Sequence, residues 1–345
     1  RQGLEVKEVG FLPMLEPPEY SRYVMLDIPE GCGEMTVCSR QTGRIAAGLL
    51  LLLAMSYAVS RRWKSALSVF ACAILIKPQA LMFAPIGLLV LVCEMIAARE
   101  KRSETLGQIG AGIGMMLGFI VAAALPFSLA QGRDPFSWLW SLYAGTLNEY
   151  NYITVNACNF YVLLGMNWRA LGDAGAWTYI AWAAYAAAFG LAVWFYVKSG
   201  DRSTVFLLCA MVLSVIFAFG AKMHERYLYP AIALLLAAYA VDRDARILGT
   251  AIMLSASVFL NGALVLEDQW LMNSRVPSVI VAVLNTAAAP MLVWTGWDIC
   301  LRRRYLNADK LLEREKQVAE SARISGAKTP ILRAGHYKLN LRRAD

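Results

Sequence analysis

Nine apolar blocks follow one another along this chain, and they constrain its fold more than any other feature. They cover residues 45–60, 65–77, 79–98, 106–127, 176–197, 204–220, 226–241, 247–266 and 277–299. A helix needs about 20 residues to cross a hydrocarbon layer roughly 30 Å thick, and most of the blocks come close to that length. The composition agrees, because 58% of the residues are hydrophobic and 17% are charged, against roughly 45–50% and 25% in soluble domains. The sequence therefore predicts an all-α fold, a polytopic transmembrane helical bundle of about nine spans.

Lys and Arg are divided unevenly between the connections that join these blocks. One alternate set of connections holds thirteen of them, namely Arg61, Arg62, Lys64, Arg99, Lys101, Arg102, Lys198, Arg202, Arg243, Arg246, Arg302, Arg303 and Arg304. The other set is longer and holds six, namely Lys77, Arg133, Arg169, Lys222, Arg226 and Arg275. Because cytoplasmic loops carry the excess of basic residues, the first set is predicted to be cytoplasmic. We therefore expect a multi-pass protein of the cell membrane, with residues 1–44 and the longer polar connections on the extracytoplasmic side.

Three regions follow from this topology. Residues 1–44 form an extracytoplasmic segment, in which the strand-like run 23–28 suggests the end of a small β-rich region. Residues 45–300 form the transmembrane core. Residues 301–345 form a basic cytoplasmic tail with twelve Lys or Arg against five Asp or Glu, which suits anionic lipid headgroups better than nucleic acid. We therefore expect the lipid bilayer, and no nucleic acid, among the partners.

The longest outer connection between spans, residues 128–173, is rich in aromatic side chains rather than hydrophilic ones. Its nine aromatic residues are Phe136, Trp138, Trp140, Tyr143, Tyr150, Tyr152, Phe160, Tyr161 and Trp168. Amphipathic aromatic side chains are typical of the boundary between membrane and water, so we expect helices that lie in the outer interface.

The densest group of ionisable side chains is the run 222–230, between two apolar blocks on the predicted outer side. Lys222, His224, Glu225 and Arg226 place four ionisable groups within five residues, which is costly at a membrane boundary unless they are solvated, paired or used. Arg and Lys suit phosphate, and His can share a proton near neutral pH. The plainer interpretation is a short loop whose Lys and Arg extend to the headgroups, but we favour a functional site.

Two further polar groups lie on the same predicted side. Asn156 and Asn159 are three residues apart and share a face if the segment is helical, and amides beside aromatics such as Tyr161 are suited to sugar hydroxyls and ring faces. A polar interfacial helix would explain them equally well. Lys77 and Gln79 stand at the outer end of a span, where Lys usually extends to the headgroups. Together, these groups lead us to expect that the polar, potentially reactive residues all collect on the outer side.

That location limits the donor that an enzyme could use. Nucleotide sugars and ATP are cytoplasmic, so an outer transferase needs a donor that arrives by another route, such as a lipid-linked sugar phosphate. Arg226 and Lys222 would hold the lipid phosphate, and the apolar bundle would hold the polyprenyl chain.

Three stretches also resemble a known family. Residues 76–81, IKPQAL, resemble the KPQALL stretch of bacterial membrane mannosyltransferases similar to the second mannosyltransferase of GPI-anchor synthesis. Residues 156–165, NACNFYVLLG, resemble their NAYNLWALLG, and residues 223–230, MHERYLYP, resemble their MHERYLFP. These enzymes belong to the GT-C superfamily of multi-span glycosyltransferases, and the resemblance covers about residues 45–300.

The resemblance implies an inverting transfer of a hexose from a polyprenyl phosphate to an extracytoplasmic acceptor, with mannose as the first candidate for the hexose. The catalytic positions would be His224 and Glu225, orienting phosphate or acceptor. Substrate would be bound, or its pocket shaped, by Lys222, Arg226, Tyr227, Tyr229, Asn156, Asn159, Tyr161, Lys77 and Gln79. The superfamily's catalytic Asp, in the first outer loop, is not recognisable here, so we expect the general base to precede Arg1 and the chain to be incomplete. No cofactor is implied with certainty, and a divalent metal ion stays open.

Two other functions stay open at this point. A transporter or flippase of lipid-linked sugars would need polar residues along a path within the spans. A non-catalytic membrane protein of envelope assembly would need no general base at all.

Overall fold

The computed structural model describes residues 7–8, 24–25, 40–97, 102–149, 151–267 and 275–306. The chain divides into two compact units, Arg1–Arg40 and Gln41–Asp345. In the first, strand β1 (Lys7–Glu8) pairs antiparallel with β2 (Val24–Met25), and β2 falls inside the run expected to be a strand. The basic tail from residue 307 onward lies outside the described residues.

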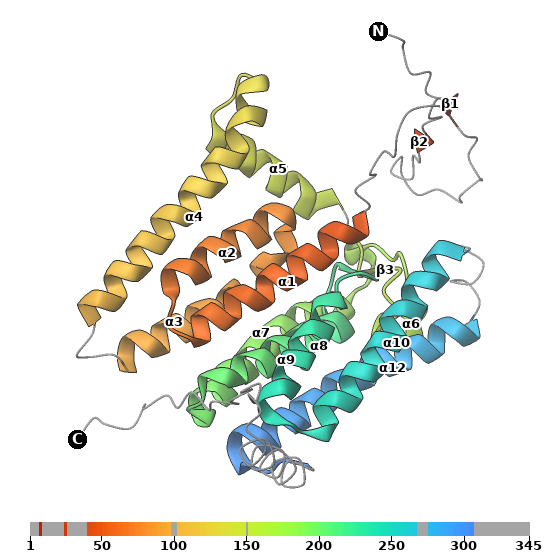
Figure 1. The fold of residues 1–345 in the computed structure, drawn as a ribbon. Helices are drawn as coiled ribbons and strands as arrows, with labels where there is room; N and C mark the ends of the chain where they lie inside the picture. The colour runs from red at the N-terminus through yellow and green to blue at the C-terminus, as the bar shows by residue number, and fades with distance from the viewer. Residues whose placement is uncertain are drawn as a thin grey trace, which may run out of the picture. The chain divides into compact units, whose positions relative to one another are not determined.

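The second unit is built almost wholly of helices, as the sequence predicts (Figure 1). Its first part contains α1 (Arg40–Val59), α2 (Trp63–Ile76), the 3-10 helix η1 (Pro78–Phe83), α3 (Ala84–Ala97), α4 (Arg102–Ala130) and α5 (Pro135–Glu149). Short elements follow, namely β3 (Thr154–Val155), α6 (Phe160–Leu163) and η2 (Leu171–Asp173). The last part contains α7 (Ala176–Ser199), η3 (Arg202–Thr204), α8 (Val205–Phe219), β4 (Met223–His224), α9 (Tyr229–Asp242), α10 (Ala245–Glu267), α12 (Arg275–Trp297) and the π-helical turn η4 (Asp298–Arg302).

Six stretches of described helix are long and apolar enough to cross a membrane. They are Pro78–Ala97, Arg102–Ala130, Ala176–Ser199, Arg202–Phe219, Ala245–Val265 and Val276–Arg302. The other three predicted spans coincide with shorter apolar helices, Ala46–Val59, Trp63–Ile76 and Tyr229–Asp242. The fold is therefore compatible with a multi-pass membrane protein.

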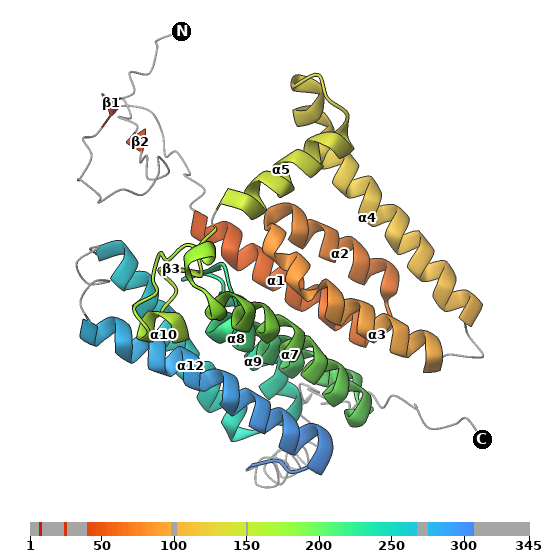
Figure 2. The same cartoon turned by 180° about the vertical axis from the view of Figure 1, so that it is seen from behind.

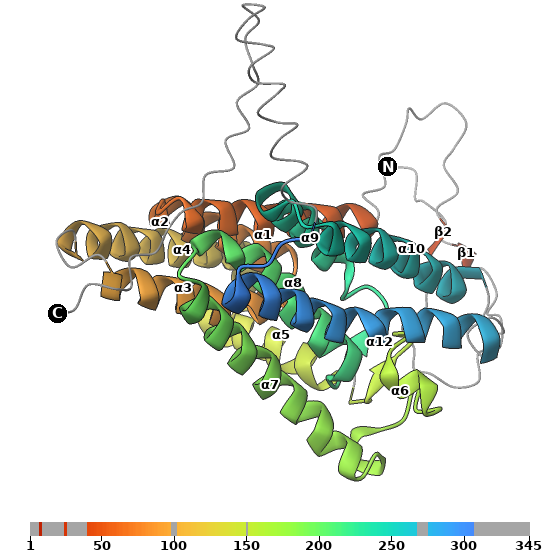
Figure 3. The same ribbon diagram turned by 90° about the horizontal axis from the view of Figure 1, so that it is seen from below.

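Helix α8 is the central helix of the second unit. It packs against α7, α9 and α12 (Figure 3). Of the stretch Arg202–Phe219, which consists of η3 and α8, 94% is buried, against 11% of the apolar part of α4. Helix α7 can approach it closely because a stripe of small residues at helical spacing is buried, namely Ala181, Ala184, Ala188 and Ala192.

Helices α2 and α4 form a second close pair. A side chain at Gly112 of α4 would lie 3.1 Å from the Cα atom of Lys64, so the glycine permits this contact between helices. Helix α5 then turns back from the end of α4 (Figure 2). Its first turn is capped by Asp134, whose Oδ1 accepts hydrogen bonds from the N–H groups of Phe136 and Ser137, at 3.1 and 2.9 Å. The 128–173 segment is thus partly helical, as expected, and Trp140 on α5 is exposed.

The end of the unit opposite β3 and β4 contradicts the expectation that reactive polar groups gather on one side. Glu94 of α3 is 2% exposed and lies between two arginines, 2.6 Å from Arg61 Nε and 3.0 Å from Arg202 Nε. Nearby, Arg246 bridges Asp244 and Asp298 at 2.8 and 2.6 Å. These groups come from separate helix ends, and pairing within a low-dielectric interior is what makes their burial tolerable.

Candidate functional site

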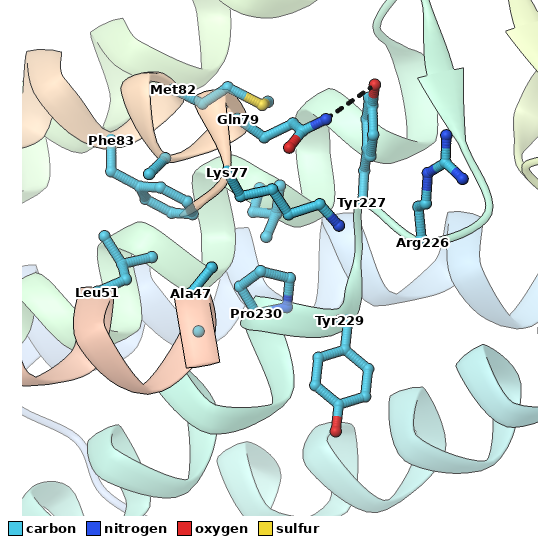
Figure 4. Close-up of a pocket in the computed structure, with 13 residues that line it drawn as sticks. Ala47, Leu51, Lys77, Gln79, Met82, Phe83, Arg226, Tyr227, Tyr229 and Pro230 are labelled. Carbon is cyan, nitrogen blue, oxygen red and sulfur yellow. Dashed lines mark hydrogen bonds between the residues drawn. The ribbon is translucent and has the colours of Figure 1, made fainter. Parts of the chain in front are cut away.

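A small cavity of about 40 Å³ lies between α1 and η1 on one side and α8 and α9 on the other (Figure 4). Its apolar wall consists of Ala47, Gly48, Leu51, Ala80, Met82, Phe83, Leu213 and Pro230. Its polar wall consists of Lys77, Gln79, Arg226, Tyr227 and Tyr229. Since one water needs roughly 10–15 Å³ of such space, the cavity has room for only a few water molecules.

Lys77 reaches the cavity because α2 ends there. Pro78 cannot continue the hydrogen-bond ladder and disfavours helix in the residue before it, and Lys77 accordingly has an extended backbone with φ −150° and ψ 108°. Figure 4 shows its side chain directed toward the stretch of chain that carries Tyr227 and Arg226. Two cationic residues that are far apart in the sequence therefore line one cavity.

One hydrogen bond joins the two walls of this cavity. Gln79 Nε2 donates to the hydroxyl oxygen of Tyr227 at 3.4 Å, which is long for such a bond. Arg226 has a loose ion pair with Glu225, 3.8 Å away, and its side chain stays 26% exposed. A loosely paired guanidinium beside an apolar wall can bind an anion that brings its own apolar chain.

The structure gathers only part of the residues that the sequence singles out. Lys77, Gln79, Arg226, Tyr227 and Tyr229 line the cavity. The remaining candidates lie around it without lining it, namely Lys222, His224, Glu225, Asn156, Asn159 and Tyr161. Lys77 and Arg226, rather than Lys222 and Arg226, are thus the cationic residues among those that line the cavity.

His224 lies in β4 and is 4% exposed. Burial, followed by the charges of Arg226 and Lys77, lowers the pKa of His224 from 6.5 to about 3. The imidazole is thus neutral at physiological pH. The sequence-based expectation that His224 shares a proton near neutral pH is therefore wrong, because the residue is buried beside two cationic side chains. Its ring lies 5.1 Å from that of Tyr227, centroid to centroid, so it supports a residue of the cavity.

The segment that carries Asn156 is paired through its backbone with the segment that precedes Arg226. Strand β3 pairs in parallel with β4, with Thr154 opposite Met223 and Val155 opposite His224. Asn156 has a left-handed backbone with φ +53°, forms a further bridge to His224, and accepts a bond from Trp168 Nε1 at 2.8 Å. Its side chain is therefore engaged in holding the loop.

Asn159 and Tyr161 have similar roles. Both are fully buried. Asn159 caps α6 by accepting from the N–H of Tyr161 at 3.1 Å, and it donates to the carbonyl of Phe217 at 3.0 Å. The hydroxyl of Tyr161 donates to the carbonyl of Phe219 at 2.7 Å. Of the two roles expected for these residues, contact with sugar or shaping of the pocket, the geometry favours shaping.

Sequence reasoning missed two buried amides that bond to this motif. Asn261 of α10 and Asn285 of α12 bond to the backbone of residues 156–158. The signal was available, because each is an amide inside an apolar block, where an unbonded polar group is costly.

Carboxylates are absent from the residues that line the cavity. Within the described ranges, no three His, Cys, Asp or Glu residues gather in a way that could hold a metal ion.

Comparison with known proteins leaves the family open. No protein-family model matches the chain, and neither a curated protein nor a solved structure matches it.

Proposed function

We propose that this chain is a GT-C-type glycosyltransferase that moves a hexose from a polyprenyl phosphate to an acceptor on the extracytoplasmic side. Mannose is the first candidate for the hexose. The observation that carries the proposal is the cavity, in which Lys77 and Arg226 stand against an apolar wall. A polyprenyl phosphate presents that same combination of anion and hydrocarbon. The amide of Gln79 and the phenols of Tyr227 and Tyr229 supply the groups that sugar hydroxyls need.

In the proposed reaction, Arg226 and Lys77 stabilise the phosphate as it leaves with additional negative charge. His224 supports Tyr227 as a neutral ring, and Glu225 orients the guanidinium of Arg226. The acceptor hydroxyl must lose its proton to a base, and the lining residues offer no carboxylate for that step. We therefore assign the general base to a group other than the lining residues.

The size of the cavity requires that it widen for a sugar phosphate. Its walls belong to two different sets of helices, and the hydrogen bond between Gln79 and Tyr227 that joins them is long, at 3.4 Å. Separation of η1 from the start of α9 would admit the donor.

The test uses membranes that contain the full-length protein and radiolabelled polyprenyl-phosphate mannose. We expect Arg226→Ala and Lys77→Ala to reduce transfer about 10- to 100-fold each, since a hydrogen bond to a charged group contributes roughly 1.5–3 kcal/mol. Arg169→Ala is the matched control, because Arg169 is exposed and donates to the carbonyl of Asp173 rather than lining the cavity. Full transfer by both cavity variants would refute the assignment.

The apolar wall offers a second arm of the same test. A side chain at Gly48 would meet no atom within 4 Å, so Gly48→Ala should leave transfer unchanged while Gly48→Leu fills the cavity and suppresses it. Equal activity of the two variants would mean that the donor binds elsewhere.

The same assay separates the other two functions. Label that crosses the bilayer without reaching an acceptor would support a flippase. If the label neither crosses the bilayer nor reaches an acceptor, the result would support a non-catalytic protein. The polar side chains described within α10 and α12 favour the enzyme, because Asn261 and Asn285 bond to a loop instead of lining a path.

A further inference from the structure

Two amides stand inside the apolar helices α10 and α12, which pack against each other. Asn261 is 0% exposed and Asn285 is 1% exposed. A buried amide is costly unless its polar atoms are hydrogen-bonded. Their bonding partners therefore show what they are retained for.

Those partners belong to the turn that follows β3. Asn261 Oδ1 accepts from the N–H of Cys158 at 3.0 Å, and Asn261 Nδ2 donates to the carbonyl of Asn156 at 2.8 Å. Asn285 Nδ2 donates to the carbonyl of Cys158 at 2.7 Å. The hydroxyl of Ser257, one turn before Asn261 on α10, donates to Asn285 Oδ1. The two helices thus satisfy backbone groups of a turn that has no helix of its own.

The position of this turn determines where β4 lies, and with it the cavity-lining residues Arg226 and Tyr227. Asn156 has the left-handed backbone, which is uncommon for a residue other than glycine and is stable only when its surroundings hold it. Its backbone is bridged to His224, and β3 pairs with β4 directly beside it. Arg226 and Tyr227, which line the cavity, follow two and three residues after His224.

We propose that Asn261 and Asn285 are positioning residues, which hold Arg226 and Tyr227 in the geometry that binds the donor phosphate. This inference rests on the proposed function for the chemistry of the ligand. A continuous chain of bonded groups runs from the interior of α10 and α12 through the 156–158 turn and β4 to the cavity. Neither amide touches the cavity, so neither contacts substrate.

The experiment compares Asn261→Ala and Asn285→Ala with Thr250→Ala and Thr295→Ala. The controls remove buried polar groups from the same two helices, but Thr250 and Thr295 bond within their own helices, to the carbonyls of Arg246 and Met291. Hydrogen exchange is followed at the amides of Lys222 and Tyr227, which donate to the carbonyls of Ile153 and His224. We expect exchange at least about fivefold faster in the asparagine variants, and unchanged exchange in the controls.

Transfer kinetics with polyprenyl-phosphate mannose give the second measurement. In the asparagine variants we expect the donor KM to rise about tenfold or more with a smaller change in kcat, since misplaced cationic groups weaken phosphate binding. Unchanged exchange at Lys222 and Tyr227 would overturn the positioning role. Faster exchange with unaltered KM would show a purely structural role and overturn it as well.

The two proposals fail in different ways. An inactive wild-type protein would refute the proposed function, and the exchange measurement would still decide whether the amides hold the loop. An active wild type whose asparagine variants match the threonine controls would refute the positioning role alone.

Discussion

His224 shows how a buried residue acquires properties different from those of the same residue in water. It is 4% exposed and lies among Arg226, Lys77 and Tyr227. Both burial and the neighbouring positive charges disfavour the imidazolium. The residue is therefore a neutral group at the pH where the sequence pattern indicated a titrating one.

This state has a consequence for stability at low pH. Because the pKa of His224 is about 3 in the folded chain and 6.5 as its ordinary value, the unfolded chain binds the proton first as the pH falls. Stability should therefore decline between about pH 6.5 and 3, by up to a few kcal/mol at about 1.4 kcal/mol per pKa unit. We expect the Tm of His224→Gln to depend less on pH over pH 7 to 4.5 than that of the wild type, measured in detergent. Parallel curves for the two proteins would contradict the burial of a neutral imidazole.

At the scale of elements, the passage from α8 to β4 sets the position of the site. Helix α8 ends at Phe219 and is followed by Gly220, where a side chain would lie 2.4 Å from the carbonyl oxygen of Ile216 and 3.0 Å from the ring of Tyr185. The hydroxyl of Tyr185 donates to the carbonyl of Ala221 at 2.8 Å, so the ring cannot easily move aside. A glycine is thus needed where the chain leaves the central helix.

Substitution at this glycine should disturb both fold and site. Gly220→Ala must displace backbone, and overpacking of this kind costs about 1–3 kcal/mol, so we expect a lower Tm and loss of transfer. Gly190→Ala in α7 is the matched control, because a side chain there meets no atom within 4 Å, and removal of a helical glycine stabilises by roughly 0.5–1 kcal/mol. The two alanines should therefore shift Tm in opposite directions, and shifts of the same sign would contradict the packing described at Gly220.

At the scale of the whole second unit, the cavity lies where two sets of helices meet. One wall comes from α1 and η1, and the other from α8 and α9. At the opposite end, α3 packs against α7 and α8, and Glu94 of α3 pairs with Arg202, which precedes α8. One end is thus joined by a buried ion pair, whereas a long hydrogen bond between Gln79 and Tyr227 joins the walls at the cavity.

The ion pairs of Glu94 can be tested because its two arginine partners differ in exposure. Arg202 is 5% exposed, whereas the side chain of Arg61 is 51% exposed. Removal of one partner of a buried pair costs about 3–5 kcal/mol. Loss of Arg61 should cost less, because its guanidinium is half exposed and solvent screens its attraction to Glu94. Thermal denaturation should therefore show a large loss for Arg202→Gln and a small one for Arg61→Gln. Equal losses would mean that Glu94 is not held mainly by Arg202.

Much of the fold was predictable because helices in such a chain follow from local sequence. Apolar blocks of the right length predicted the helices, and the predicted block 176–197 differs from α7 by two residues at its end. Pro78 predicted the break after Lys77, although the start of the next block is the 3-10 helix η1 rather than α-helix. The motifs carrying Lys77, Gln79 and Arg226 were also correctly chosen as neighbours, since all three line one cavity.

The apolar pattern of the chain was thus enough to predict the helices and their order, and the sequence motifs were enough to propose some of the residues that line the cavity. The three-dimensional packing was needed to show that α8 is central and that Lys77 lines the cavity with Arg226. It was also needed to show that Glu94 is ion-paired and that Asn261 and Asn285 are hydrogen-bonded inside the bundle. The physical reason is that side chains that face lipid and side chains that face protein are equally apolar in such helices. Periodicity therefore does not show which face is inside, and the partner of a buried charge or amide is set by packing between segments far apart in the chain.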